Sequence, residues 1–239
     1  MLRSLIFVLL IFLFGHSFAQ KQVTTYYDDS QELVKEKYYV QSNNPNILVG
    51  KYKKMHPNGK LATSGSFLNG YKDGRFEEYY ESGQLNRILY FKDGQKEGEV
   101  KVYNERGQLI QAASFANNKL DDSIFIYYDN GAIRSKGYFK NDHPEGLLIE
   151  YYAQGQVKRE ITYSEGKQTG ITKTYYPNGQ LHTEGHYVNG IVNGYYVTYF
   201  RNGQIETKST LIEGAKSGSF QNYDSLGNLL LDGKYESGV

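Results

Sequence analysis

Apolar and polar positions recur along this chain with a period of 24 residues, most clearly in the stretch Gly74–Glu97, GRFEEYYESGQLNRILYFKDGQKE. In each unit a tyrosine stands four residues before a central glycine, an aliphatic residue two after it, and an aromatic residue eight after it, with two exceptions in eight copies. The central glycines are Gly59, Gly83, Gly107, Gly131, Gly155, Gly179, Gly203 and Gly227. Such a period indicates a repeat architecture in which each unit is one small supersecondary element.

The central glycine marks a hairpin turn. A Pro-Asn-Gly triplet stands at residues 57–59 and again at 177–179. Proline and asparagine suit the two central positions of a type I turn, and a following glycine in the left-handed region forms the G1 bulge of a three-residue hairpin loop. We therefore expect each unit to be a β-hairpin in which Tyr79 pairs with Leu85, and likewise Tyr151 with Val157 and Tyr175 with Leu181.

Strand alternation then predicts which residues share a face. Counting outward by two from Tyr79 and Leu85 places Leu89 and then Phe91 on their face. The copies of Leu89 are often small, which leaves room for neighbouring rings: Ala113, Gly137, Ile161, Gly185, Ser209 and Gly233. The opposite face is expected to carry Phe76 and Tyr80.

A second glycine position closes each unit. It is filled by Gly70, Gly94, Asn118, Asp142, Gly166, Gly190, Gly214 and Gly238. Asparagine and aspartate tolerate a positive φ best after glycine, so the position requires that backbone geometry. Hairpin follows hairpin, and the chain is predicted to be all-β: a single elongated, twisted antiparallel meander of about eight to nine 24-residue β-hairpin repeats.

These motifs resemble those of the MORN repeat variant family, whose unit is roughly GxFxxYYxNGQLxxxxxYxNGxxxG. The copy at Gly170–Gly194, GITKTYYPNGQLHTEGHYVNGIVNG, is nearly identical to it, and the resemblance covers about Gly50 to Gly238. It implies a single layer of hairpins, and roles in scaffolding and in binding proteins or lipids. Bacterial proteins built from this variant often carry an antitoxin-component label, which implies an antitoxin-like role.

The N-terminal residues differ from the repeats. Arg3, an apolar run from Leu5 to Phe14 and a small-residue site ending at Ala19 predict a signal peptide at residues 1–19. Residues 20–49 resemble a degenerate N-terminal capping repeat with a long linker from Val40 to Leu48, and residues 50–239 hold eight repeats. The protein is therefore expected to be exported, and to be periplasmic or extracellular after cleavage near Ala19.

Composition argues against several classes of function. The net charge is only +1, so a nucleic-acid binder is not expected. The chain has no cysteine and no nucleophile motif. His182 and His186 have a spacing that suits a metal on a helix but separates them by about 13 Å on a strand. We expect no enzymatic activity, no catalytic residue, no metal site and no cofactor.

One aromatic position suggests a binding surface. Next to the paired tyrosines, successive repeats carry Tyr80, Tyr128, Tyr152, Tyr176 and Phe200, with polar residues toward both ends of the array. These rings either stack to hold neighbouring strands together or line a groove for a partner. The expected partner is a protein, with a glycan or a lipid headgroup as alternatives, and self-association through the sheet edges is a further route.

The sequence is consistent with three functions. The first is a non-enzymatic exported repeat scaffold that binds a protein, or an envelope glycan or lipid, through the aromatic face. The second is an antitoxin or immunity-like component of a toxin–antitoxin pair. The third is a structural subunit of the cell envelope.

Overall fold

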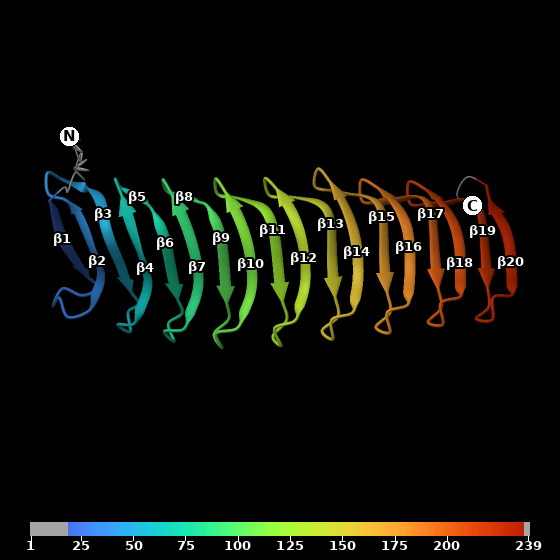
Figure 1. The fold of residues 1–239 in the computed structure, drawn as a ribbon, viewed down its shortest axis with the longest axis horizontal. Coiled ribbons are helices and arrows are strands. Elements are labelled where there is room, and N and C mark those ends of the chain that lie inside the picture. The colour runs from blue at the N-terminus through green and yellow to red at the C-terminus, as the bar shows by residue number, and fades with distance from the viewer. Residues whose placement is uncertain (1–18, 237–239) are drawn as a thin grey trace, which may run out of the picture.

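The computed structural model describes residues 19–236, which form one row of strands along the long axis of the molecule (Figure 1). All of the predicted signal peptide except Ala19, and the turn residue Gly238, lie outside the described residues. The strands are β1 (Gln20–Tyr26), β2 (Val34–Gln41), β3 (Asn44–Met55), β4 (Leu61–Leu68), β5 (Tyr71–Lys72), β6 (Gly74–Tyr79), β7 (Leu85–Lys92), β8 (Gln95–Lys96), β9 (Gly98–Tyr103), β10 (Leu109–Ala116), β11 (Lys119–Tyr127), β12 (Ile133–Lys140), β13 (His143–Tyr151), β14 (Val157–Ser164), β15 (Lys167–Tyr175), β16 (Leu181–Val188), β17 (Ile191–Tyr199), β18 (Ile205–Ile212), β19 (Ala215–Tyr223) and β20 (Leu229–Tyr235).

The strands form a single antiparallel meander, which confirms the predicted fold class. The longer strands pair in chain order, from β1–β2 to β19–β20. β4 pairs with both the two-residue strand β5 and the following β6, and β7 likewise pairs with both β8 and β9. Residues 20–49 form β1, β2 and the first part of β3, so the expected linker from Val40 to Leu48 is mostly strand. In residues 19–236 we find no helix of the length and apolarity needed to span a membrane.

The turns have the backbone geometry that the glycine positions predicted. In the central turn the Gly83 N–H donates to the carbonyl of Tyr80 at 2.8 Å, and φ of Gly83 is 89°. In the closing turn Asn118 and Asp142 have φ of 68° and 70°, so the two non-glycine copies adopt the same left-handed conformation. Asn and Asp stand at these positions because, after glycine, they adopt a positive φ most easily.

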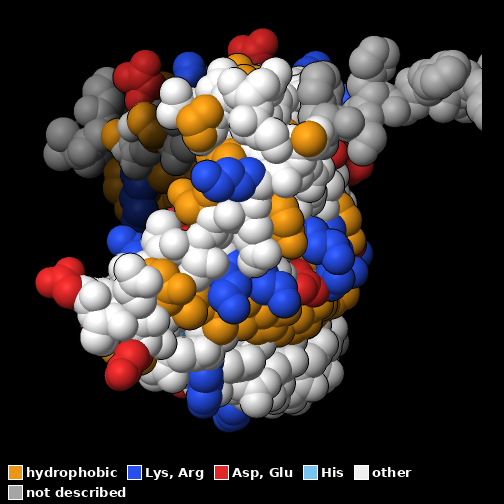
Figure 2. All heavy atoms as spheres, turned by 90° about the vertical axis from the view of Figure 1, so that its left-hand side faces the viewer, with side chains coloured by type: hydrophobic (Ala, Val, Ile, Leu, Met, Phe, Trp, Pro, Cys, Tyr) orange, Lys and Arg blue, Asp and Glu red, His pale blue; other side chains and the backbone are white. Residues whose placement is uncertain are grey.

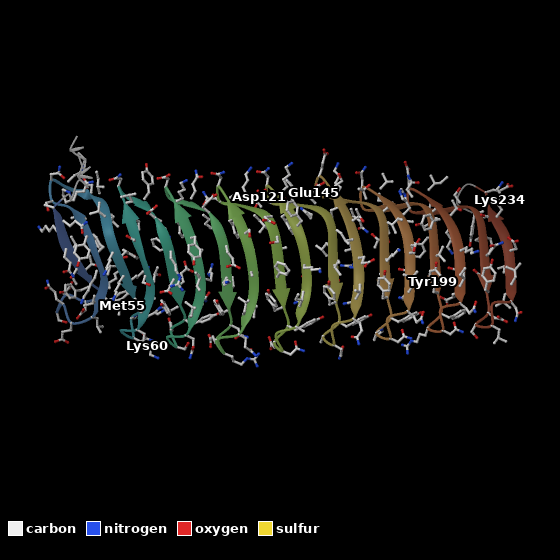
Figure 3. The ribbon with its side chains drawn as sticks, in the orientation of Figure 1. Met55, Lys60, Asp121, Glu145, Tyr199 and Lys234 are labelled. Atoms are coloured by element: carbon white, nitrogen blue, oxygen red, sulfur yellow. The ribbon has the colours of Figure 1, made fainter. Side chains whose placement is uncertain are left out.

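Acidic side chains support the closing turns from the neighbouring repeat. The carboxylates of Asp121 and Glu145, labelled near one long edge of the sheet in Figure 3, accept N–H groups of Asn141 and Glu165 at 3.1 and 2.8 Å. Lys60 lies near the other edge, where the central turns are (Figure 3). The contacts give Asp121 and Glu145 a structural role.

A bulge in each hairpin corrects the face prediction. Tyr79 pairs with Leu85 as expected, but Glu78 pairs with Arg87, so Asn86 is an extra residue in the second strand. One inserted residue reverses the alternation beyond it. Phe91 and the Leu89 position therefore lie on the face of Phe76, and the prediction that they share the face of Tyr79 is wrong.

The hydrophobic cluster of the sheet forms a ridge on this face. Phe76, Leu89 and Val100 are buried, and Phe76 is only 1% exposed. The ring of Phe76 meets those of Phe67 and Phe91 edge to face, with centroids 5.7 and 5.1 Å away. Aromatic pairs in this geometry stabilise packing beyond the area they bury. The predicted room for rings is real, because a Cβ at Gly185 would lie 2.6 Å from the ring of Tyr196.

Candidate binding groove

The sheet has two unlike faces, which we name by their side chains. The groove face carries Phe76, Leu89 and Phe91 with their copies, and the outer face carries Arg75, Glu77 and Tyr79 with theirs. Seen along the ribbon from its N-terminal end, the cross-section is hollowed on one side (Figure 2). Clefts lined mainly by groove-face residues lie along the array, so this face offers the concave surface for a partner.

The predicted binding tyrosines connect neighbouring repeats. Each hydroxyl donates to a main-chain carbonyl 23 residues further along the chain, at 2.7–2.8 Å: Tyr80 to Tyr103, Tyr128 to Tyr151, Tyr152 to Tyr175 and Tyr176 to Tyr199. In the same position Nε2 of His56 lies 2.9 Å from the carbonyl of Tyr79, while Phe200 has no hydroxyl. All five predicted residues are half-buried. Four of them thus link neighbouring repeats by a hydrogen bond, and part of each ring remains accessible.

We expect Tyr152→Phe to lower the free energy of unfolding by about 1 kcal/mol, because it removes one hydrogen bond and leaves the carbonyl of Tyr175 without that donor. Urea denaturation followed by far-UV circular dichroism measures the change. Phe200→Tyr is the matched control, since it adds a hydroxyl where the array lacks one. An unchanged midpoint for Tyr152→Phe contradicts this linking role.

The bulge residue brings polar groups onto these rings. The imidazole of His182 lies against the ring of Tyr176, with centroids 4.3 Å apart, and Nζ of Lys158 lies 6.0 Å from the ring centroid of Tyr152. The preceding repeat carries Arg134 at the same position. Sequence reasoning did not place these residues beside the tyrosine rings, because simple alternation counts the bulge position as an ordinary strand residue.

One polar stretch of the groove spans β12 to β17. A cleft of about 440 Å³ and an adjoining one of about 250 Å³ share Glu150 and Lys158 in their walls. The first is lined by Glu150, Tyr152, Lys158, Arg159, Thr174, Tyr175, His182, Thr183 and Tyr196, and the second by Ile126, Tyr128, Arg134, Ser135, Glu150, Tyr151 and Lys158. Tyr128, Tyr152 and Tyr176 of the prediction are all at or beside this stretch, whereas Tyr80 and Phe200 lie outside its lining.

The side chains that line these two clefts carry a net positive charge. Nη2 of Arg159 pairs with Oε1 of Glu150 at 2.7 Å, and the hydroxyls of Thr174 and Thr183 are 2.7 Å apart. With Arg134 and Lys158 the two clefts hold three basic side chains and one carboxylate, a net charge of +2. The arrangement suits an anionic partner whose oxygen atoms accept hydrogen bonds from the hydroxyl and basic groups of the clefts.

On the outer face, tyrosine hydroxyls donate to carboxylates. Tyr175 donates to Oε2 of Glu160 at 2.9 Å. Burial, and then this hydrogen bond, raise the pKa of Tyr175 to about 12. Such a contact holds the phenol protonated.

We expect the fold to lose the contribution of Tyr175 as the pH rises from about 10, the value for an unfolded tyrosine, through about 12, because only the phenol form is favoured in the folded chain. Below pH 10 the contribution is fully present. Spectrophotometric titration of tyrosine absorbance in wild type and Tyr175→Phe isolates this group. Glu160→Gln is expected to lower its pKa, and an unchanged titration curve in that variant would contradict the assignment.

His182 and His186 lie in different surroundings. His182 stacks on Tyr176 in the groove, and Nδ1 of His186 lies 2.8 Å from the carbonyl of Asn193. Within residues 19–236 no three His, Cys, Asp or Glu side chains are placed to hold a metal ion.

Comparison with known families identifies the repeat. Five segments of the chain, residues 72–93, 96–117, 124–141, 144–165 and 168–189, match the family model described as MORN repeat variant. The resemblance seen in the sequence is therefore confirmed for these five repeats. No curated protein matches the chain.

Among solved structures the chain is similar to parts of much larger proteins. A crystal structure of TcdB2-TccC3-Cdc42 matches with 11% identity and a TM-score of 0.22 over 86% of this chain and 13% of that one. A Tc holotoxin pore of Photorhabdus luminescens matches with 9% identity and a TM-score of 0.22, over 90% and 15%. TcdB2-TccC3 without its hypervariable C-terminal region matches with 12% identity and a TM-score of 0.23, over 86% and 13%. Likenesses at these scores support no inference about function.

Proposed function

We propose that this chain, five of whose repeats match the MORN repeat variant, is a non-enzymatic scaffold that binds a protein partner in its groove. The observation that supports the proposal is the continuous polar stretch between β12 and β17, where tyrosine rings, threonine hydroxyls and basic side chains share one concave surface. Concave surfaces lined by aromatic rings and a few placed polar groups are typical binding sites.

The shape of the sheet favours an elongated partner. The clefts are open and follow one another along the array, so a folded globular domain would contact only part of their lining, whereas an extended segment can follow it. Repeat arrays use such extended concave surfaces for binding. With the signal peptide predicted at residues 1–19, we place the partner in the periplasm or outside the cell.

Site-specific photocrosslinking tests which face binds. A photoreactive amino acid is placed at Ser135, which lines the groove, or at Lys136, whose ammonium lies 5.7 Å from the Tyr151 ring centroid on the outer face. These adjacent positions differ mainly in the face they occupy. After exposure to an extract of producing cells, we expect a discrete adduct from position 135 and none from position 136. Equal labelling at both positions, or labelling at 136 alone, would refute groove binding.

A further inference from the structure

We propose that the groove between β12 and β17 binds a peptide in the polyproline II conformation that runs along the ribbon and carries an acidic residue at every third position. The inference rests on the proposed function and specifies the chemistry of its partner. Two independent observations support it, the spacing of the repeats and the distribution of charge.

The repeat spacing matches the pitch of this peptide conformation. Equivalent residues of successive repeats are two strands apart, because each repeat contributes two strands to the meander. Strands lie about 4.8 Å apart, so equivalent residues recur every ~9.6 Å along the array. A polyproline II helix has three residues per turn and a rise of about 3.1 Å, which gives ~9.3 Å per turn. Every third peptide side chain would therefore meet the same position of the next repeat.

A peptide in the β conformation fits this spacing less well. Its side chains on one side recur about every 6.8 Å, so they would fall out of step with the repeats after one unit. The aromatic residues at this period, Tyr128, Tyr152 and Tyr176, provide the kind of surface on which polyproline II segments dock.

The charge of the groove selects acidic side chains. Arg134 and Lys158 occupy the bulge position of successive repeats, followed by His182, whereas the repeats on either side have Ile110 and Glu206 there. At the bulge position, basic or imidazole side chains are thus confined to three consecutive repeats. Neither Arg134 nor Lys158 forms an ion pair with a residue in the range 19–236, while other arginines such as Arg87 do.

The two basic groups would be neutralised by carboxylates one peptide turn apart. Both side chains are exposed and line the clefts, so each can move to meet a ligand. The neighbouring cation Arg159 is already paired with Glu150 and can hold the wall in place. Opposite charges on a ligand and its groove raise the association rate and fix the register of binding.

Fluorescence anisotropy with labelled peptides tests the proposal on the full chain. The probe is (Pro-Pro-Glu)4, and the control of identical composition is a block peptide of eight prolines followed by four glutamates. We expect (Pro-Pro-Glu)4 to bind about tenfold more tightly than the block peptide or (Pro-Pro-Lys)4, and its affinity to fall as salt is added. Equal affinity for the two acidic peptides overturns the spacing argument.

Matched double variants locate the site. Arg134→Gln with Lys158→Gln is expected to weaken (Pro-Pro-Glu)4 binding about tenfold or more, while Lys136→Gln with Lys173→Gln, an equal change of charge on the outer face, stays within about twofold. Circular dichroism and the urea midpoint establish that each variant is folded. Equal losses in both variants overturn the assignment to the groove.

The outcomes separate this inference from the proposed function. A labelled oligogalacturonate that binds more tightly than any peptide indicates an acidic glycan and refutes the peptide. If no peptide binds but position 135 still crosslinks selectively, the groove is used by a partner of other chemistry and only this inference fails. If crosslinking is also unselective, the proposed function fails as well.

Discussion

Replacing Phe76 by alanine is expected to lower the free energy of unfolding by about 3–5 kcal/mol, which is the largest effect of any single substitution proposed for this chain. The ring is 1% exposed and lies between the rings of Phe67 and Phe91. Its loss removes apolar contacts on both sides and leaves a void that the neighbouring strands, fixed by their hydrogen bonds, do not close. Urea denaturation measures the total loss, and hydrogen exchange of β4, β7 and β9 shows where it is felt.

Tyr90→Ala provides the control for this experiment. Tyr90 pairs with Arg75 on the outer face and is 40% exposed. Removing its ring is expected to change the free energy of unfolding much less, by about 0.5 kcal/mol. Losses of similar size in the two variants would show that the outer face, and not the groove face, carries the stabilising contacts.

Gly65→Ala is expected to destabilise the chain by about 1–3 kcal/mol, the second largest effect, because it forces a methyl group into an occupied space. A Cβ at this position would lie 2.4 Å from two ring atoms of Phe76. The ring is enclosed by its neighbours, so the strand or the ring has to shift. The urea midpoint of the variant measures the change.

Two comparisons test that explanation. A Cβ at Gly137 would be 3.4 Å from Leu148, so Gly137→Ala is expected to be better tolerated. In a Phe76→Ala background the added methyl has room, and Gly65→Ala should then cost much less than in wild type. If the cost is the same in both backgrounds, backbone preference rather than the ring of Phe76 determines it.

The one-sided core explains why the groove can serve as a binding surface. Side chains such as Phe76 and Phe91 hold adjacent hairpins together near one edge of the groove face, and the tyrosine hydroxyls tie the repeats near the other. Between these two lines of contacts the groove face stays open, and its polar residues vary from repeat to repeat. The packing and tyrosine contacts recur in successive repeats, whereas the polar residues of the groove do not. We therefore expect binding specificity to depend on these polar residues.

Much of the fold could be predicted from local sequence. The Pro-Asn-Gly turn at residues 57–59 identified the hairpin, and the 24-residue period carried the same pairing to Tyr79 and Leu85 around Gly83, because turn geometry acts over a few residues. The positive φ of Asn118 and Asp142 could be predicted from the types that fill a glycine position. The face of Phe91 could not, since the bulge at Asn86 depends on how two strands meet.

The candidate site could be predicted only in part, because the repeat period locates residues but not their contacts across strands. The period located Tyr128, Tyr152 and Tyr176, but it did not show that their hydroxyls reach carbonyls of the next repeat. It also gave no reason to group Lys158 with Tyr152, because a strand residue is assigned to a face only by counting, and the bulge alters the count.

The sequence by itself determined the repeat, the turns and the order of the strands, because these depend on residues close together in the chain and on conformations that only glycine, asparagine or aspartate adopt easily. Only the tertiary structure decided which residues share the groove face and which charges remain uncompensated within it. That decision depends on a one-residue bulge and on contacts between residues more than 20 positions apart, such as Tyr152 with Tyr175.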